Sequence, residues 1–298
     1  IPGNAVQNVM AKFPNLQPSA YKALEALLGV GHPGSIWHQY VTYLDDIFHF
    51  NFGTDVSQYP AQVSSLLVQT LPWTITLVGV ATVIAFLIGT ALGIVAGWRH
   101  GGTLDRVLPG LMFLQAIPYF FFALILVELL AIKTQVFPSG QGYADGLIPG
   151  WHWDFISSAL YHSALPALTI VLTSIAGWML QMRNVMITTT GEDYVIAAQA
   201  KGLPNRRVIY TYAARNALLP QLQGFGLAVG FVVSGAIVME IVFGYPGIGL
   251  LLLNAVTSND YPLMQAIFLV ITFAVLLANL IVDMIIVIAD PRARRMEA

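Results

Sequence analysis

Residues 191–220 read GEDYVIAAQAKGLPNRRVIYTYAARNALLP and separate two long apolar runs. Charge is scarce in this chain, yet this segment holds six charged side chains: Glu192, Asp193, Lys201, Arg206, Arg207 and Arg215. The acidic pair favours a helix that begins near Asp193, because carboxylates stabilise the positive end of a helix dipole. The segment therefore predicts a folded element that lies outside the apolar layer.

The spacing of small residues predicts a helix, a turn and a second helix within this segment. Residues at i, i+3, i+4 and i+7 share one face of the first helix, and here they are Tyr194, Ala197, Ala198 and Lys201. Gly202 can take the left-handed conformation that ends a helix, and Pro204 suits the first turn of the next. Together with Ala200, the alanines would form a shallow surface for a partner's backbone. The alternative is a solvated loop that only joins two spans.

The chain as a whole has the composition of a membrane protein. Of its 298 residues, 57% are hydrophobic and 9% are charged, whereas roughly a quarter are charged in soluble domains. A helix of about 20 apolar residues can cross a bilayer. Five runs are long enough: 71–98, 107–132, 164–182, 218–243 and 263–289. We therefore expect an all-α, polytopic membrane protein.

Basic residues are distributed unequally between the two sides of these spans. Ten lie in the loops on one side, and only Lys12, Lys22 and Lys133 lie on the other. Loops rich in lysine and arginine stay in the cytoplasm. We therefore expect the polar segment and the C-terminus inside the cell and residues 1–70 outside it.

Local patterns give further expectations. Small residues recur at every fourth position of the first span and would let another helix approach closely: Ala81, Ala85, Gly89, Gly93 and Gly97. Pro118 should kink the second span, because its ring removes a backbone donor and clashes with the preceding turn. Residues 19–29 and 36–48 are typical of short helices, and His162 is expected to begin the helix of the third span.

The runs DYVIAAQAKGL and ARNALLP resemble the cytoplasmic signature loop of ABC importer permeases, in the branch that contains the dipeptide, oligopeptide and nickel transporters. Importers generally begin this loop with Glu-Ala-Ala and place a glycine four positions after the second alanine. In this chain Ile196 replaces the glutamate. The resemblance implies a coupling helix that sits in a groove of an ATPase subunit. The residues it implicates are Asp193, Tyr194, Ala197, Ala198, Ala200, Lys201, Gly202, Leu203, Arg206, Arg207 and Asn216.

A second segment, EIVFGYPGIGLLLLNAVTSNDYPLMQ at residues 240–265, resembles the same family's E.VF..PG.G.L.......DYP..Q pattern. Its PGIG turn is expected to form part of the outward-facing pathway or a gate. A rigid re-entrant turn is the alternative, because glycine and proline fix a turn whatever its role. Charged residues in apolar runs are further candidates, since each costs roughly 3 kcal/mol to insert. The candidate pathway or gate residues are Glu240, Pro246, Gly247, Gly249, Asp260, Gln115 and Asp283.

The resemblance also implies an architecture and an assembly. The fold would be the type I permease fold of ABC importers, with five transmembrane helices here and a sixth expected before the IPGN start. Two domains are expected: an extracytoplasmic region at 1–66 and a transmembrane permease domain at 67–298 with its coupling loop at 183–219. The implied partners are a second, homologous permease in a heterodimer, two ABC ATPases, an extracytoplasmic substrate-binding protein and the lipids of a bacterial cytoplasmic (inner) membrane. Nucleic acid is not expected.

The sequence carries no GxxxxGK[ST], GxSxG or HExxH motif and no cysteine, so no enzyme chemistry and no metal site are expected. We expect no cofactor in this chain, with ATP and Mg²⁺ bound by the partner ATPases. Short peptides are the expected substrate, and nickel or oligosaccharides are the alternatives within the family. An ATP-independent secondary transporter or channel, with Asp283 and Glu128 as ion-coupling groups, is the alternative of a different class. Such transporters often contain inverted repeats, and none is evident here.

Overall fold

The computed structural model describes residues 35–55, 58, 60–230 and 237–289. Across these residues the fold is all-α, as predicted, and one isolated antiparallel bridge joins Thr54 and Gln62. The helices in chain order are α3 (Ile36–Phe48), α4 (Val63–Trp98), α5 (Thr103–Ala116), α6 (Tyr119–Leu126), η1 (Val127–Lys133), α7 (Trp153–Thr190), α8 (Asp193–Ala200), α9 (Asn205–Arg207), η2 (Val208–Ala214), α10 (Arg215–Gly230), α12 (Ile237–Phe243), α13 (Ile248–Ser258) and α14 (Tyr261–Ala289).

Three of these helices are long and apolar enough to cross a membrane: α4, α7 and the Tyr261–Ile281 part of α14. Two bent pairs pass the same test, α5 with α6 and η1, and α12 with α13. The described residues therefore hold five candidate spans if each bent pair counts as one. The expected run at 218–243 is divided between α10 and α12, and residues 231–236 between them are outside the described ranges.

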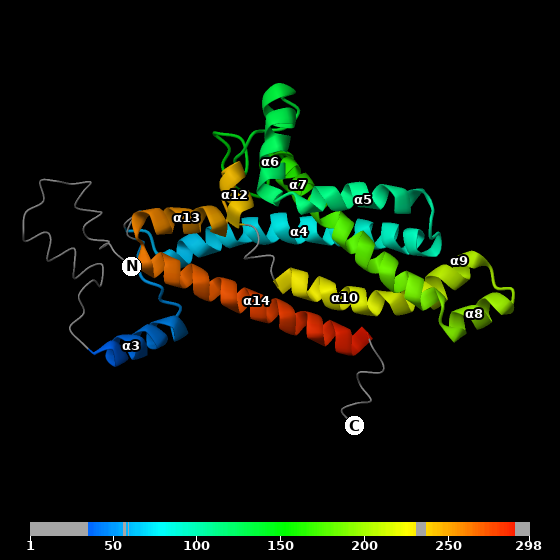
Figure 1. The fold of residues 1–298 in the computed structure, drawn as a ribbon. Coiled ribbons are helices and arrows are strands. Elements are labelled where there is room, and N and C mark those ends of the chain that lie inside the picture. The colour runs from blue at the N-terminus through cyan, green and yellow to red at the C-terminus, as the bar shows by residue number, and fades with distance from the viewer. Residues whose placement is uncertain (1–34, 56–57, 59, 231–236, 290–298) are drawn as a thin grey trace, which may run out of the picture.

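The predicted kink at Pro118 is confirmed. The axes of α5 and of the α6–η1 segment meet at 96°. Ile117, the residue before the proline, has φ −74° and ψ 126°, the extended backbone that a following proline favours. As a result α6 stands upright in Figure 1, whereas α4, α5, α10 and α14 run across the view.

The centre of the fold is the long contact between α4 and α7. The predicted stripe of small residues lies in this contact. A Cβ on Gly93 would come within 2.6 Å of the Met182 Cβ and 2.7 Å of the Met179 carbonyl oxygen. Gly89 faces Trp178 and Gly97 faces Met186 in the same way. The glycines therefore allow the two backbones to approach closely.

Two expectations about helix starts have different outcomes. Helix α3 has the predicted bounds, and the helix expected at 19–29 falls outside the described residues. The prediction for His162 was wrong, because α7 begins at Trp153 and His162 lies inside it. His152 is the residue that caps this helix, since its Nδ1 accepts a hydrogen bond from the Phe155 N–H at 3.3 Å.

Candidate functional site

The polar segment folds as a helical hairpin at one end of the molecule (Figure 1). Its first helix, α8, begins at Asp193 as predicted. Gly202 has φ +71°, so the predicted left-handed turn is confirmed, and Pro204 is the N-cap of α9 rather than a residue of its first turn. The second arm continues from α9 through the π-helical η2 into α10.

One side of α8 is attached to the rest of the chain. Val195 and Ala198 are buried in a cluster with Ile94 of α4, with Met182 and Met186 of α7, and with Val208 of η2. Ala198 therefore does not belong to an exposed alanine face as expected. An eight-residue helix can bury only a narrow stripe, and Val195 and Ala198 are three residues apart on that stripe.

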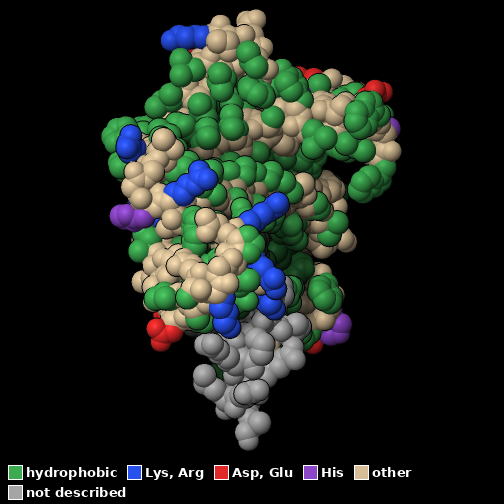
Figure 2. Space-filling model, turned by 90° about the vertical axis from the view of Figure 1, so that its right-hand side faces the viewer, with side chains coloured by type: hydrophobic (Ala, Val, Ile, Leu, Met, Phe, Trp, Pro, Cys, Tyr) green, Lys and Arg blue, Asp and Glu red, His purple; other side chains and the backbone are tan. Residues whose placement is uncertain are grey.

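The opposite side of α8 is exposed to solvent. The exposed residues of α8 are Asp193, Tyr194, Ile196, Ala197, Gln199 and Ala200, and Lys201 and Gly202, which follow the helix, are exposed as well. Arg206 and Arg207 on α9 are also exposed, as is Asn216, whose Nδ2 donates to the Tyr212 carbonyl at 3.0 Å. Leu203 is half-buried and packs against the buried cluster. Figure 2 views this end, where Lys and Arg side chains are spread over the surface and Asp and Glu are few.

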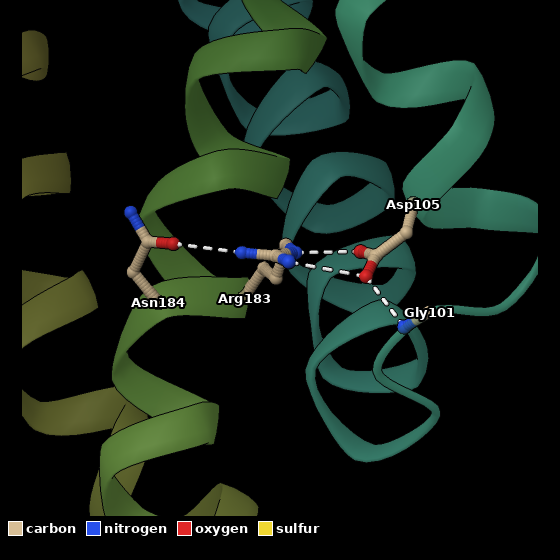
Figure 3. A network of polar contacts seen from close by, with 4 residues as sticks. All are labelled: Gly101, Asp105, Arg183 and Asn184. Atoms are coloured by element: carbon tan, nitrogen blue, oxygen red, sulfur yellow. Dashed lines mark hydrogen bonds and ion pairs between the residues drawn. The ribbon is translucent and has the colours of Figure 1, made fainter.

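An ion pair that the sequence did not predict lies beside this hairpin. Arg183 Nε donates to Asp105 Oδ1 at 2.5 Å and Arg183 Nη2 donates to Oδ2 at 3.0 Å. The Gly101 N–H also donates to Oδ2, at 2.7 Å (Figure 3). The pair therefore joins the first turn of α5 to α7.

The PGIG turn of the segment 240–265 lies at an elbow of 86° between α12 and α13. Glu240 is completely buried at this elbow. Its Oε1 accepts a hydrogen bond from Thr74 Oγ1 at 2.6 Å, and its Oε2 accepts one from the Gly249 N–H at 2.5 Å. Thr74 Oγ1 in turn accepts from the Ile248 N–H at 2.9 Å. Glu240 and Thr74 therefore bind the free N–H groups at the start of α13.

Two glycines make room for this carboxylate. A Cβ on Gly247 would overlap the Glu240 carboxylate, and one on Gly249 would overlap Ile237 of α12. Pro246 is half-buried, and a Cβ on Gly142 would lie 2.7 Å from the Pro246 ring. The geometry therefore matches a rigid bend, with the carboxylate bonded to backbone and hydroxyl groups rather than left open.

The remaining candidates lie apart from the elbow. Asp260 is buried, and its Oδ1 accepts from the Leu263 N–H at 3.0 Å in the first turn of α14. Gln115 is exposed on α5, with its side chain next to Gly177 of α7. Asp283 is exposed towards the end of α14. Within the described ranges, no three His, Asp or Glu side chains are grouped as a metal site requires.

Several known proteins of similar sequence are named as permeases of transport systems. The family model described as "Binding-protein-dependent transport system inner membrane component" matches residues 89–295. The oligopeptide transport system permease protein AppB of Bacillus subtilis (strain 168) is 32% identical over 256 residues, covering 85% of this chain and 79% of the Bacillus protein. The dipeptide transport system permease protein DppB of Escherichia coli (strain K12) is 31% identical over 313 residues, covering 99% of this chain and 91% of the Escherichia protein.

The fold is similar to that of a solved transporter. A chain of the inward-facing MetNI methionine ABC transporter superposes with a TM-score of 0.60 at 14% sequence identity, covering 76% of this chain and 96% of that chain. At this identity the likeness concerns the fold alone, and it agrees with the type I permease fold expected from the sequence. On the sequence match and the fold together, this chain belongs to the family of binding-protein-dependent transport system inner membrane components, and is a multi-pass membrane permease.

Proposed function

We propose that this chain is the permease subunit of an ATP-driven importer, and that it moves short peptides delivered by a substrate-binding protein. The observation that carries this proposal is the α8 hairpin. It has a buried stripe attached to α4 and α7 and an exposed, small-residue side at the basic end of the molecule. Relatives named for oligopeptide and dipeptide transport support peptides as the substrate. Nickel and oligosaccharides are the alternative substrates.

The exposed side of α8 would bind in a groove of an ATPase subunit. Ile196, Ala197 and Ala200 offer a shallow apolar surface, while Lys201 and Arg206 offer charge at its edge. Movement of the docked hairpin would pass into α4 and α7, because Val195 and Ala198 pack against Ile94, Met182 and Met186. Close-packed interiors transmit such displacements with little loss.

The elbow between α12 and α13 would form part of the pathway or its gate. A rigid bend with no part in gating is the alternative. Glu240, Gly247 and Gly249 hold the bend, and Pro246 lies on it. Asp260, Gln115 and Asp283 are further candidates to line the pathway, and they would act at other positions along it.

The complete importer would contain a second homologous permease, two ABC ATPases and an extracytoplasmic binding protein, in the cytoplasmic membrane of a bacterium. The hairpin would face the cytoplasm, and the Lys and Arg side chains at this end of the molecule support that orientation (Figure 2). The C-terminus is expected on the same side. Residues 1–66 would lie outside and residues 67–298 would form the transmembrane domain. ATP and Mg²⁺ would bind the ATPases, so this chain would carry no cofactor and no catalytic residue.

An ion-coupled transporter is less well supported. Glu128 lies on an exposed surface and pairs with Lys133 at 3.5 Å, and Asp283 is also exposed. Ion-coupling carboxylates in membrane proteins face the interior of the bundle or a water-filled cavity. Glu128 and Asp283 are both exposed on the surface of this chain instead.

Reconstitution of the complete importer in liposomes tests the proposal. Uptake of a radiolabelled mixture of di- to pentapeptides is expected to require ATP inside the vesicle and the binding protein outside it. Nickel chelates and oligosaccharides should not compete with the peptides. Uptake that needs no ATPase subunit and follows an imposed ion gradient would overturn the proposal.

A further inference from the structure

We propose that the ion pair between Asp105 and Arg183 transmits movement of the α8 hairpin to the bend between α5 and α6. Both residues would then be positioning residues for transport, acting on the gate through helices and not through contact with the substrate. This inference rests on the proposed function, because it requires an ATPase to move the hairpin.

The geometry of the pair suits a mechanical connection. Two parallel hydrogen bonds join the guanidinium to the carboxylate, at 2.5 and 3.0 Å, and they fix the relative orientation of the two side chains as well as their distance (Figure 3). The Arg183 side chain is 18% exposed and that of Asp105 is 11% exposed. Exposed pairs contribute little because water screens them, whereas this pair is largely shielded.

Arg183 lies in the turn of α7 that holds the hairpin. The neighbouring Met182, and Met186 one turn later, are completely buried in the cluster that contains Val195 and Ala198 of α8. A displacement of α8 therefore acts on the same turn of α7 that carries Arg183.

Asp105 lies in the first turn of α5, at the other end of the connection. Helix α5 continues to Ala116 and then turns by 96° at Pro118 into the α6–η1 segment. Phe122 and Leu126 of α6 share a buried cluster with Met239 and Phe243 of α12. The pair therefore joins the hairpin to the helix that carries Glu240, through packed elements along the whole route.

A purely structural role makes a different prediction. If the pair only stabilises the fold, its loss lowers the amount of folded protein, and uptake and ATP hydrolysis decrease together. If the pair transmits movement, the ATPases still hydrolyse ATP while uptake falls. The ratio of peptide taken up to ATP hydrolysed therefore separates the two roles.

The test uses the complete importer in liposomes, with peptide uptake and ATP hydrolysis measured on the same vesicles. Asp105→Asn and Arg183→Gln are each expected to lower the ratio of uptake to hydrolysis about tenfold, within the usual range of coupling between sites. Arg183→Lys keeps the positive charge but cannot form the two parallel hydrogen bonds to Asp105, so a smaller decrease in this ratio, about threefold, is expected. Lys133→Gln is the matched control, because it breaks the exposed pair with Glu128, and it should leave the ratio unchanged.

A second measurement does not depend on the transported substrate. The chain has no cysteine, so Leu124→Cys on α6 and Leu277→Cys on α14 can be spin-labelled at exposed sites. ATP is expected to change the distance between the labels in the otherwise unaltered chain, and Asp105→Asn should abolish that change. An unchanged ratio, a parallel loss of uptake and hydrolysis, or an equal ATP response in Asp105→Asn would each overturn the inference. No ATP response and no uptake in the unaltered importer would overturn the proposed function, and this inference with it.

Discussion

The α8 hairpin and the α12–α13 elbow are both helix–turn–helix elements built around glycine, yet their surroundings are opposite. Gly202 in the hairpin has open space around it and φ +71°. Gly247 in the elbow is buried against the Glu240 carboxylate. The hairpin needs Gly202 for the shape of the backbone, and the elbow needs Gly247 and Gly249 for the absence of a side chain. An exposed element suits a partner, whereas a buried one suits a fixed bend.

The largest expected effect is at the elbow. Gly247→Val would place a side chain on the Glu240 carboxylate and break its hydrogen bonds to the start of α13. We expect a loss of stability of about 3 kcal/mol or more, from overpacking together with unsatisfied buried groups. Thermal unfolding of the purified chain in detergent measures this. Gly79→Ala in α4, where a Cβ would meet nothing within 4 Å, is the matched control.

Removal of the Thr74 hydroxyl should cause a smaller loss of stability at the same site. Thr74→Val removes one donor to Glu240 and one acceptor for the Ile248 N–H. We expect a loss of about 2 kcal/mol, because a buried carboxyl oxygen of Glu240 and the Ile248 N–H then each lose a hydrogen bond. Thr70→Val on the same helix is the control, since Thr70 bonds only to carbonyls of the preceding turn, the nearer being Leu66 at 2.9 Å. Equal unfolding temperatures for the two variants would contradict the importance of this network.

The hairpin should respond in transport more than in stability. Gly202→Val strains a left-handed backbone by roughly 1–2 kcal/mol and alters the surface offered to an ATPase. We expect uptake to fall about tenfold, within the usual size of coupling energies, with normal insertion into the membrane. Gly146→Val is the matched control, because Gly146 has φ +85° and open space but lies far along the chain from the hairpin. Similar uptake by the two variants would count against the coupling role.

These two regions also differ in how well the sequence predicted them. The start of α8 and the left-handed turn at Gly202 followed from local signals, namely an acidic first turn and a glycine two residues before a proline. The kink at Pro118 likewise needed only one residue. The resemblance of residues 240–265 to a known pattern indicated that Glu240 and Gly247 matter, but not why.

Long-range contacts were beyond the reach of local patterns. Thr74 is 166 residues from Glu240 in sequence, and Asp105 is 78 residues from Arg183. Local sequence patterns could not predict these contacts, because the apolar pattern of each helix is complete without the partner residue on the other helix. The burial of Ala198 was missed for a related reason. Alanine fits both a buried and an exposed face, so only the packing of α8 against α4, α7 and η2 decides which of its sides is covered.

The smallest expected effect concerns the charges at the edge of the hairpin. Arg206→Gln with Arg207→Gln should weaken binding of the ATPase subunits about threefold at low salt, because exposed charges contribute at most about 1 kcal/mol and are screened. The difference from the unaltered chain should disappear at high salt. Pull-down of the purified ATPase by the permease in detergent, at two salt concentrations, measures this. Arg99→Gln is the control, because it removes an exposed positive charge outside the hairpin and should leave ATPase binding unchanged. An equal loss of binding with Arg99→Gln would mean that binding depends on the overall charge of this end and not on the hairpin.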